Sequence, residues 1–402
     1  MWPTLRAILV GSLCVAMTSC GWLGCRKKPK DYAKPLPPGE NALVKLTDPK
    51  DYPDFGVGFK NRDGLAQAID YSLEYYKHPS SKQFFPYKVP NDQGISHERA
   101  VATLENFKKV LAEAKDAADL HRIICERFDV YMSRGCDEMG TVLFTGYCTP
   151  IFKGSLTRSP EYNYPIYKQP DDLVKKPDGT PVGRRTEAGE IVPYYTRREI
   201  ETQQTLAGKG LELAWLKSPL DVHIVHVQGS AKIELADNST LSIGYAGKTD
   251  RPYGSVGLAL VADKKISAED LSLQKMIEYF DKRPHEMKTY VYKNDSYVFF
   301  AKQEGEPRGS LNLPVTPYRS IATDKAVFPR GLLSYAVTKA PKMTSAGTVS
   351  LEPFYSFTLD QDTGGAIRSA GRCDVYMGIG PQAMLLAGRT RAEGKLYYLA
   401  TK

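Results

Sequence analysis

Apolar residues recur at helical spacing through the first third of the chain. Positions three or four apart share one face of a helix. Between Asp63 and Pro79 they form a stripe made of Leu65, Ile69, Leu73 and Tyr76. A second stripe follows Ser96, a candidate N-cap, and a third predicts a helix over residues 117–128. The chain is therefore expected to open with helices.

The pattern changes after Gly140. Short runs of β-branched and aromatic residues, separated by Gly and Pro, predict a barrel-like sheet through to the C-terminus. One helix is expected to interrupt it, because Ser267 and Asp270 form a capping-box signature before an apolar stripe that Pro284 ends. Residues 162–197 are rich in Pro, Gly and charge and predict a long surface loop.

Two histidines lie in a segment whose pattern predicts a strand, residues 221–227. Residues three apart on a strand point to opposite faces, so His223 and His226 would be poor metal co-ligands. No pair of cysteines has the spacing of a zinc knuckle or a thioredoxin site. We expect no metal and no cofactor.

The first residues look like a targeting segment. Arg6 precedes an apolar run over residues 7–17, which is too short for a stable membrane anchor and reads as a signal peptide. Small residues then precede Cys20, an arrangement that resembles the bacterial lipobox, whose cysteine is lipidated and becomes the mature N-terminus. The alternatives are Cys25, which has the bulky Trp22 three residues before it, and an uncleaved anchor. Gly21 stands where an aspartate would hold a lipoprotein at the inner membrane, so the resemblance implies an outer membrane lipoprotein facing the periplasm.

Composition and charge narrow the class of partner. With 402 residues, 42% hydrophobic and 25% charged, the chain has the composition of a folded protein with room for two cores. Loss of residues 1–19 would remove only Arg6 and lower the net charge from +8 to +7. A basic protein favours polyanionic partners. The expected compartment excludes nucleic acid and leaves cell-wall glycan and membrane headgroups.

Four cysteines lie beyond residue 25: Cys125, Cys136, Cys148 and Cys373. An oxidising periplasm permits disulfides, and Cys136 with Cys148 is the favoured pair, although spacing alone does not determine connectivity. Buried free thiols are the alternative.

A glycine turn framed by two acids carries the candidate chemistry. Asp362 precedes Gly364 and Gly365, and Asp374 follows on a predicted strand where it alternates with apolar residues. Paired glycines let a ligand approach the backbone closely. Composition alone would also allow a plain turn in which Asp362 caps backbone amides and Asp374 is a solvated strand residue.

This segment resembles the aspartate-rich C-terminal motif of the membrane-bound lytic murein transglycosylase A family. Further blocks similar to that family follow in family order from about Leu143 to the C-terminus. They include Phe144-Thr145-Gly146-Tyr147, Arg197-Arg198-Glu199-Ile200, Leu213-Ala214-Trp215-Leu216, Val227-Gln228-Gly229-Ser230, Gly244-Tyr245-Ala246-Gly247-Lys248, Ser296-Tyr297-Val298-Phe299-Phe300 and Pro314-Val315-Thr316-Pro317.

The resemblance implies roles for individual residues. Asp374 takes the position of the family's single catalytic acid, and Asp362 that of the neighbouring supporting aspartate, which we expect to raise the pKa of Asp374. Arg372 would lower that pKa, and we expect it to pair elsewhere. The expected glycan-binding residues are polar, aromatic or glycine: Thr145, Tyr147, Gln228, Ser230, Tyr245, Lys248, Gly364 and Gly365. Cys148 and Thr149 depart from the family pattern, which indicates one altered glycan subsite.

The implied fold is mainly β with N-terminal helices, a double-psi β-barrel domain and a second, inserted β-barrel domain. The expected parts are a signal peptide over 1–19, a tether over 20–45, the catalytic domain over 46–147 and 308–402, and the inserted domain over 148–307. A glycan groove would lie between the two domains.

The function that follows is non-hydrolytic cleavage of peptidoglycan between N-acetylmuramic acid and N-acetylglucosamine. A single carboxyl suffices if the muramic acid 6-hydroxyl is the nucleophile, because the group can first donate and then remove a proton. The partners implied are glycan strands, the membrane through an N-terminal lipid, and cell-wall synthesis complexes. A non-catalytic peptidoglycan-binding lipoprotein is the alternative from another class, and a hydrolase is the third.

Overall fold

The computed structural model describes residues 30–177, 179–268 and 270–402. The predicted signal peptide, Cys20 and residues 20–29 of the predicted tether lie outside these residues. Within the described ranges, no helix has both the length and the apolarity needed to cross a membrane.

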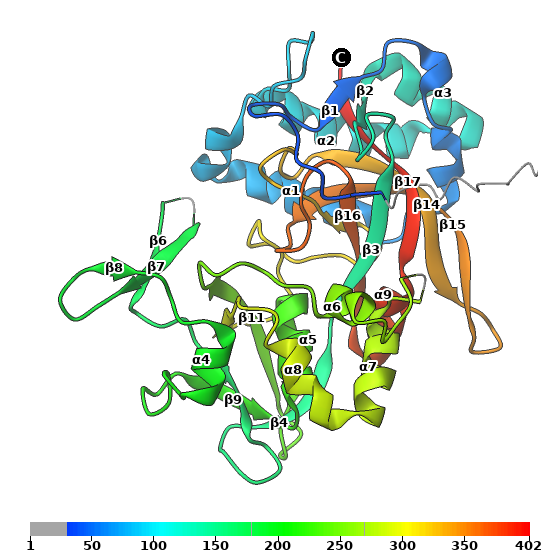
Figure 1. Cartoon of the computed structure of the whole chain (residues 1–402). Coiled ribbons are helices and arrows are strands. Elements are labelled where there is room, and N and C mark those ends of the chain that lie inside the picture. Colours follow the sequence, from blue (N-terminus) through cyan, green and yellow to red (C-terminus); the bar gives the residue numbers. More distant parts are fainter. Residues whose placement is uncertain (1–29, 178, 269) are drawn as a thin grey trace, which may run out of the picture. The chain divides into compact units, whose positions relative to one another are not determined.

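Six strands of the larger sheet close into a barrel (Figure 1). The sheet order is β1-β2-β17-β14-β15-β13-β16-β3, and a further pairing of β17 with β3 closes the ring from β17 to β3. The strands are β1 Leu43–Lys45, β2 Phe128–Ser133, β3 Val142–Thr149, β13 Ser320–Ala322, β14 Leu333–Met343, β15 Val349–Asp362, β16 Arg372–Ile379 and β17 Arg391–Thr401. Strand β3, which follows the N-terminal helices, thus lies beside the C-terminal strand β17 in the barrel.

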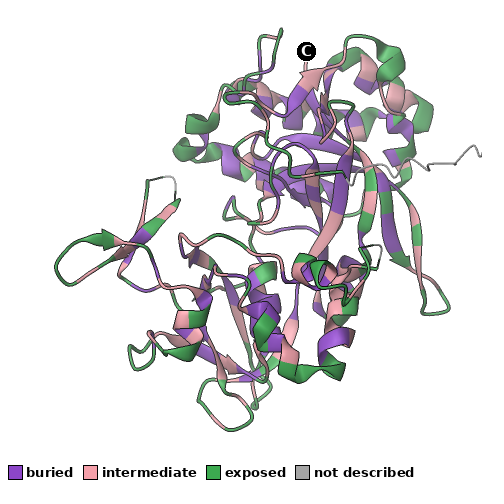
Figure 2. Ribbon diagram, viewed as in Figure 1, coloured by how far each residue is buried: buried purple, intermediate pink, exposed green. Residues whose placement is uncertain are grey.

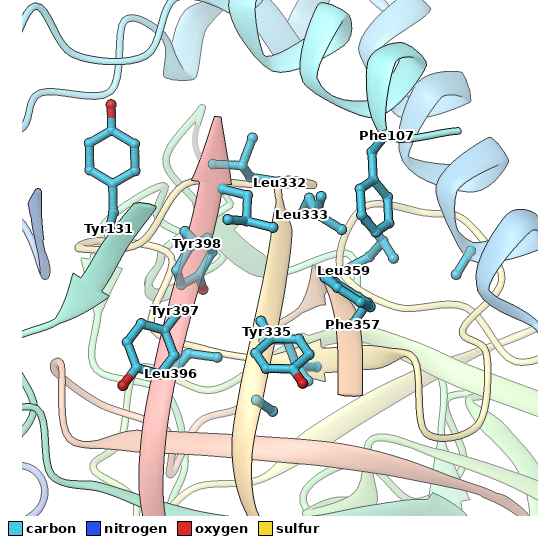
Figure 3. Packing of buried hydrophobic residues seen from close by; sticks show 14 of the residues in the cluster. Phe107, Tyr131, Leu332, Leu333, Tyr335, Phe357, Leu359, Leu396, Tyr397 and Tyr398 are labelled. Carbon is cyan, nitrogen blue, oxygen red and sulfur yellow. The ribbon is translucent and has the colours of Figure 1, made fainter. Parts of the chain in front are cut away.

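Three helices cover this sheet on one side: α1 Leu65–Lys77, α2 His97–Glu113 and α3 Ala117–Arg127. Ser96 caps α2 by accepting a hydrogen bond from the Arg99 amide. In Figure 3, Phe107 of α2 faces Phe357 of β15, with ring centroids 4.8 Å apart. The buried residues of all three helices join one hydrophobic core with those of the barrel strands.

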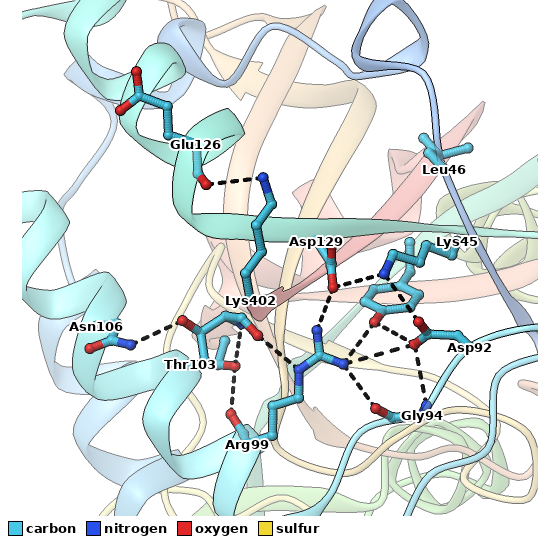
Figure 4. Close-up of polar contacts among 12 residues, drawn as sticks. Lys45, Leu46, Asp92, Gly94, Arg99, Thr103, Asn106, Glu126, Asp129 and Lys402 are labelled. Atoms are coloured by element: carbon cyan, nitrogen blue, oxygen red, sulfur yellow. Dashed lines mark hydrogen bonds and ion pairs between the residues drawn. The ribbon is translucent and has the colours of Figure 1, made fainter.

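Charged contacts fasten α2 to the sheet (Figure 4). Arg99 Nη2 lies 2.6 Å from Asp129 Oδ2, and Lys45 Nζ lies 2.9 Å from the same oxygen. Arg99 also donates to the Thr401 carbonyl at 2.8 Å. One guanidinium thus ties α2 to both β2 and β17.

The second sheet has six strands in the order β12-β11-β10-β4-β9-β5. They are β4 Ile151–Ser155, β5 Tyr164–Tyr167, β9 Glu212–Leu216, β10 Ser230–Glu234, β11 Thr240–Lys248 and β12 Val298–Lys302. A single bridge between Lys168 and Phe300 brings the two ends of this order together. The chain enters this sheet directly from β3, because only Pro150 separates β3 from β4.

The remaining elements surround these sheets. The helices are α4 Arg197–Thr202, α5 Pro219–Gln228, α6 Val256–Ala262, α7 Leu273–Lys282, α8 Met287–Val291 and α9 Gly380–Arg389. Short 3-10 turns are η1 Pro49–Asp51, η2 Phe55–Lys60, η3 Pro79–Phe84 and η4 Pro284–Glu286. Figure 2 shows buried residues concentrated in the barrel strands and exposed residues on outer helix faces and hairpin tips.

The predicted strand over 221–227 is wrong, because these residues form most of α5. Ser218 caps the helix through the Asp221 amide, Pro219 occupies its first turn, and Gly229 ends it with a φ of +76°. Its apolar residues are buried on two sides, Val222 and Val225 against the six-stranded sheet and Leu220 and Ile224 against a cluster from α6, α7 and α8. A helix buried on two sides lacks a polar stripe, so its periodicity is weak.

Three other local predictions need correction. Helices α4 to α9 replace the single helix expected after Gly140. Ser267 does accept a hydrogen bond from the Asp270 amide, but α7 starts at Leu273 and is capped by Ser272. The loop expected over 162–197 holds β5 and a three-stranded sheet of β6 Leu173–Lys175, β7 Pro181–Arg185 and β8 Ile191–Val192. Pairing between short hairpin strands stabilises structure that weak periodicity did not indicate.

The predicted disulfide between Cys136 and Cys148 does not form, because Cys148 is a free, buried thiol. The Cys136 amide donates to Thr141 just before β3, whereas Cys148 lies near the end of that strand. At about 3.3 Å per residue, the intervening extended residues separate the two by roughly 20 Å. A disulfide requires Cα atoms no more than about 7 Å apart.

Candidate active site

The two candidate acids lie in one row across the barrel wall. Asp374 of β16 is in register with Thr145 of β3 on one side and Ala322 of β13 on the other. Asp362 of β15 is in register with the same Ala322 from the opposite side. The two acids are therefore two strand spacings apart, on the order of 10 Å between Cα atoms.

Asp374 is held by two neighbours. Thr145 Oγ1 donates a short hydrogen bond to Asp374 Oδ1, and Arg372 Nη2 lies 3.7 Å from that oxygen. The Asp374 side chain is 17% exposed. Burial raises its pKa above the ordinary range, while Arg372 and the Thr145 hydroxyl oppose the increase by stabilising the carboxylate. A carboxyl of this kind can hold a proton and still become a stable anion after releasing it.

The expectation that Arg372 pairs elsewhere is wrong. Arg372 and Asp374 alternate on one face of β16, so both approach Thr145, to which Arg372 donates at 3.0 Å. Asp362 is also not among the causes that shift the Asp374 pKa; burial is the largest. The intervening strand β13 keeps the two carboxylates from direct contact.

Asp362 is fixed by backbone amides. Its Oδ1 accepts hydrogen bonds of 2.8 Å from the amides of Ser310 and Thr363. Burial raises the Asp362 pKa, and these hydrogen bonds oppose that effect. Burial and the nearby Asp362 carboxylate also raise the pKa of the Tyr147 hydroxyl well above its ordinary value. Asp362 thus combines the capping role expected of a turn residue with a place in the wall of a cavity.

The glycine turn leaves open space. A Cβ added at Gly365 would meet no heavy atom within 4 Å, and one at Gly364 would meet only Ile367. Both glycines line the cavity that contains Asp374. A Cβ at Gly365 would therefore fit without a clash and would add bulk to the lining of this cavity.

The opposite side of the cavity comes from α5 and the six-stranded sheet. Gln228 Oε1 accepts a hydrogen bond of 2.8 Å from the Cys148 amide. The Ser230 hydroxyl lies 3.0 Å from that of Thr149, which lies 3.0 Å from the Tyr376 hydroxyl. These contacts tie the end of α5 and the start of β10 to the barrel strands β3 and β16.

Two adjoining cavities form a groove along these residues. One of about 470 Å³ contains both Asp362 and Asp374, and one of about 780 Å³ contains Thr145 and Arg372. The two have several lining residues in common: Val227, Gln228, Lys248, Tyr253, Gly365, Ala366 and Arg368. Every predicted site residue other than Cys20 lines one cavity or both.

The residues that depart from the family pattern do not line the groove. Cys148 is buried in the barrel core, and Thr149 is buried between the Ser230 and Tyr376 hydroxyls. The altered subsite predicted from them is therefore not formed by their side chains.

Sequence reasoning missed other groove residues, among them Tyr253, Arg308, Ser310 and Arg368. Arg368 comes three residues after Gly365, and this nearness to the glycine turn was an available signal. Tyr253, Arg308 and Ser310 lie in segments without a motif, and only the tertiary structure brings them to the groove.

His223 and His226 are buried on α5. Arg197 Nη2 donates to His226 Nδ1 at 2.8 Å. Burial and the nearby Arg197 lower the pKa of both imidazoles, that of His223 to about 3, so both are neutral. Among residues 30–177, 179–268 and 270–402, no group of three or more His, Cys, Asp or Glu side chains is arranged to hold a metal ion.

Comparison with known proteins identifies the family. Residues 143–301 match the MltA specific insert domain, and residues 319–400 match the 3D domain. The chain is 30% identical over 276 residues to membrane-bound lytic murein transglycosylase A of Escherichia coli K12, which spans 68% of this chain and 69% of that protein. A Vibrio cholerae protein of the same name is 31% identical over 270 residues, 66% of this chain and 67% of that protein.

Solved structures agree with this match. A membrane-bound lytic murein transglycosylase from Agrobacterium tumefaciens is 26% identical with a TM-score of 0.73, over 90% of this chain and 98% of that one. E. coli MltA with bound chitohexaose shares the fold at 24% identity and a TM-score of 0.65, over 93% of this chain and 99% of that one. The chain belongs to the membrane-bound lytic murein transglycosylase A family.

Proposed function

We propose that this protein is a lytic transglycosylase that cleaves the β-1,4 bond between N-acetylmuramic acid and N-acetylglucosamine in peptidoglycan and leaves 1,6-anhydro-muramic ends. The observation that carries the proposal is the environment of Asp374, a carboxyl of raised pKa in the wall of a groove and in contact with Arg372 and Thr145. Membership of the family supports this class of reaction.

In the first step, protonated Asp374 donates its proton to the bridge oxygen, the bond from that oxygen to the muramic acid anomeric carbon breaks, and positive charge develops on the ring. In the second step, the muramic acid 6-hydroxyl attacks the anomeric carbon, and the Asp374 carboxylate takes up the hydroxyl proton. The acid is regenerated and no water is consumed. Arg372 stabilises the Asp374 carboxylate between the two steps, and this contact keeps the carboxylate from becoming strongly basic.

Asp362 supports the reaction from across β13. Its Oδ1 is occupied by two backbone amides. We assign its charge to the stabilisation of positive charge on the sugar ring, because a fixed carboxylate in a partly desolvated groove interacts strongly with such charge. It also holds the Ser310 segment against the glycine turn.

Glycan contacts are proposed along both sides of the groove. Tyr245 is 55% exposed and offers a ring face on which a sugar can stack. The Gln228 carbonyl is occupied by the Cys148 amide, which leaves its NH₂ group for sugar oxygens. Thr145, Tyr147, Ser230, Lys248, Gly364 and Gly365 complete the set. The bound chitohexaose in the E. coli structure supports a glycan in a groove of this fold.

The proposed architecture and location follow the family. The barrel is proposed to be the double-psi type, with the catalytic domain over 46–147 and 308–402 and the inserted domain over 148–307. Lipidation at Cys20 would anchor the protein at the outer membrane, facing the periplasm, where cell-wall synthesis complexes are candidate partners. The name membrane-bound, which the relatives carry, supports membrane association.

Digestion of purified sacculi tests the activity. Wild-type protein should release 1,6-anhydro-muropeptides, and Asp374→Asn should lower the rate at least ~100-fold, the lower end of what a general acid contributes. Asp281→Asn, which removes an exposed carboxylate from α7 outside the groove, is the matched control and should keep wild-type activity.

The products separate the alternatives. Reducing muramic ends would identify a hydrolase. No product from wild type, together with retained binding to sacculi, would identify the non-catalytic binding protein. Equal anhydro product from Asp374→Asn and wild type would exclude Asp374 as the acid.

A further inference from the structure

The groove carries an excess of positive charge on the side beyond Asp374. The larger cavity is lined by five cationic side chains: Lys248, Arg251, Arg368, Arg372 and Arg391. Asp250 is the one carboxylate among its lining residues. Neutral sugar rings do not account for such an excess, because hydroxyl and acetamido groups need donors and acceptors rather than net charge.

The acid in this cavity is already engaged. Asp250 Oδ1 accepts a hydrogen bond of 2.8 Å from the Tyr194 amide. Arg251 Nε donates to the Tyr194 carbonyl at 2.6 Å, so these two neighbours together brace the backbone around Tyr194. Asp250 therefore does not neutralise the charge of the other four cations in this cavity.

Lys248 and Arg368 are the two cations that contribute most clearly to the uncompensated positive charge of the groove. Both line both cavities. Within the described part of the chain, the Lys248 ammonium has neither a hydrogen-bond nor an ion-pair partner. Arg368 approaches one carboxylate, with Nη1 3.8 Å from Asp324 Oδ1, and its side chain is 51% exposed. Burial and the charge of Arg368 lower the pKa of Lys248, which indicates two cations close together in a partly desolvated site.

We propose that Lys248 and Arg368 form a subsite for a carboxylate of the substrate. The inference rests on the proposed function, since it concerns the same groove. A guanidinium fork beside an ammonium matches the two oxygens of a carboxylate, and the partly buried setting strengthens the attraction. Tyr245 lies near the same guanidinium, which lowers the Tyr245 pKa against the raising effect of burial. A sugar stacked on Tyr245 would thus direct its substituent toward the pair.

Muramic acid supplies this chemistry in two ways. Its lactyl ether ends in a carboxylate when the peptide has been removed, and the peptide stem carries carboxylates of its own when it is present. Both sources have a carboxylate attached to the sugar. Chitohexaose, built from N-acetylglucosamine alone, has none.

Binding is measured by titration calorimetry on full-length Asp374→Asn, so that the substrate is not consumed. Four hexasaccharides are compared: chitohexaose, a peptide-free alternating glycan with lactyl carboxylates, the same glycan with the lactyl groups converted to amides, and the peptide-bearing glycan. The carboxylate forms should bind at least fivefold more tightly than the amide form. This advantage should shrink as salt increases, since salt screens exposed charges.

Added Lys248→Met and Arg368→Met changes should abolish the advantage, while Arg368→Lys should retain most of it. Lys153→Met, which removes an exposed lysine from β4 outside the groove, is the matched control. An advantage with the lactyl carboxylate identifies that group as the ligand, and an advantage confined to the peptide-bearing glycan identifies the stem.

If neither the lactyl-carboxylate glycan nor the peptide-bearing glycan binds more tightly than the amide form at low salt in the Asp374→Asn protein, the subsite is overturned. A loss of affinity for all four ligands alike in Lys248→Met would also do so, because it would identify an ordinary sugar contact. The salt dependence is measured without a change at Lys248 or Arg368. It therefore still tests the subsite if one of those variants fails to fold. Failure of the proposed function would appear separately, as an absence of anhydro products from wild-type protein in the sacculus digestion.

Discussion

At the scale of single residues, opposing effects set the pKa of Asp374. Burial raises its pKa, whereas the Arg372 guanidinium and the Thr145 hydroxyl stabilise the carboxylate. These two residues come from the same strand and the neighbouring strand, so the barrel register sets the balance. A group poised in this way suits a reaction in which one carboxyl both gives and takes a proton.

The balance predicts a pH effect. In the proposed reaction, cleavage requires protonated Asp374, so activity should fall as pH increases through the Asp374 pKa. Arg372→Met and Thr145→Val each remove stabilisation of the carboxylate and should raise that pKa, so the basic limb of the profile of kcat/KM should move to higher pH. The larger shift is expected for Arg372→Met, because the charge has more influence than the hydroxyl.

The measurement is the initial rate of anhydro-product release across pH, with Lys153→Met as the control that should keep the wild-type profile. A limb that stays in place, or moves to lower pH, in both variants would show that another group titrates.

A second residue-scale prediction concerns a buried ion pair in the barrel. Lys325 Nζ makes a short contact with Asp360 Oδ1, and both side chains are almost fully buried. Asp360 also accepts hydrogen bonds from Thr323 and, at 2.7 Å, from Tyr398 of β17. Lys325→Met should lower the free energy of unfolding by about 3–5 kcal/mol, because it leaves a buried carboxylate without its counter-charge.

Urea unfolding measures this loss. The double change Lys325→Met with Asp360→Leu should cost less than the sum of the two single changes, because the unpaired charge is then absent. Strict additivity would mean that the two side chains do not interact.

At the scale of elements, α5 matters most for the groove. Its last residue, Gln228, and the first residue of β10, Ser230, both face the barrel, and Gly229 between them has a φ of +76°. A residue with Cβ is strained in this conformation. The turn thereby links the end of the helix directly to the wall of the groove.

Gly229→Ala should lower the free energy of unfolding by about 1 kcal/mol, through backbone strain alone, since no atom lies within 4 Å of the added Cβ. It should also weaken chitohexaose binding severalfold by displacing Gln228 and Ser230. Gly305→Ala is a matched control, with the same φ of +76° and the same open surroundings, outside both cavities.

Thermal melting and calorimetric titration of the two variants make the comparison. We expect both variants to lose a similar amount of stability. Only Gly229→Ala should bind chitohexaose more weakly. If both variants bind chitohexaose as the wild type does, the turn does not position the wall.

At the scale of the whole molecule, the chain runs from the barrel into the second sheet and back. The Ser230, Thr149 and Tyr376 hydroxyls form a continuous chain from β10 to β16, and the groove lies beside it. The proposed anchor lies outside the described residues, and its test concerns the full chain in the cell.

Cys20→Ser should abolish incorporation of labelled fatty acid and move the protein from the membrane to the soluble fraction. Cys25→Ser, the matched control five residues away, should leave both unchanged. The reverse result would assign the lipid to Cys25, and incorporation by both variants would exclude a lipidated cysteine at either position.

The fold was partly predictable because some signals are local. Helix α2 begins after Ser96 as expected, since a cap and an apolar stripe are short-range features. The disulfide and the strand over 221–227 were wrong for the opposite reason. Separation along β3 excludes the first, and burial of α5 on two sides removed the polar stripe that would have revealed the second.

The sequence by itself determined the family, the position of Asp374 on a strand, and a part of the groove lining, because ordered motifs and strand alternation are properties of neighbouring residues. Only the tertiary structure decided that Arg372 contacts Asp374, that β13 separates Asp374 from Asp362, and that Lys248 and Arg368 share the groove. These relations depend on barrel closure, which brings together segments more than 200 residues apart in the chain, such as β3 and β16. Side-chain electrostatics across such contacts have no counterpart in local pattern.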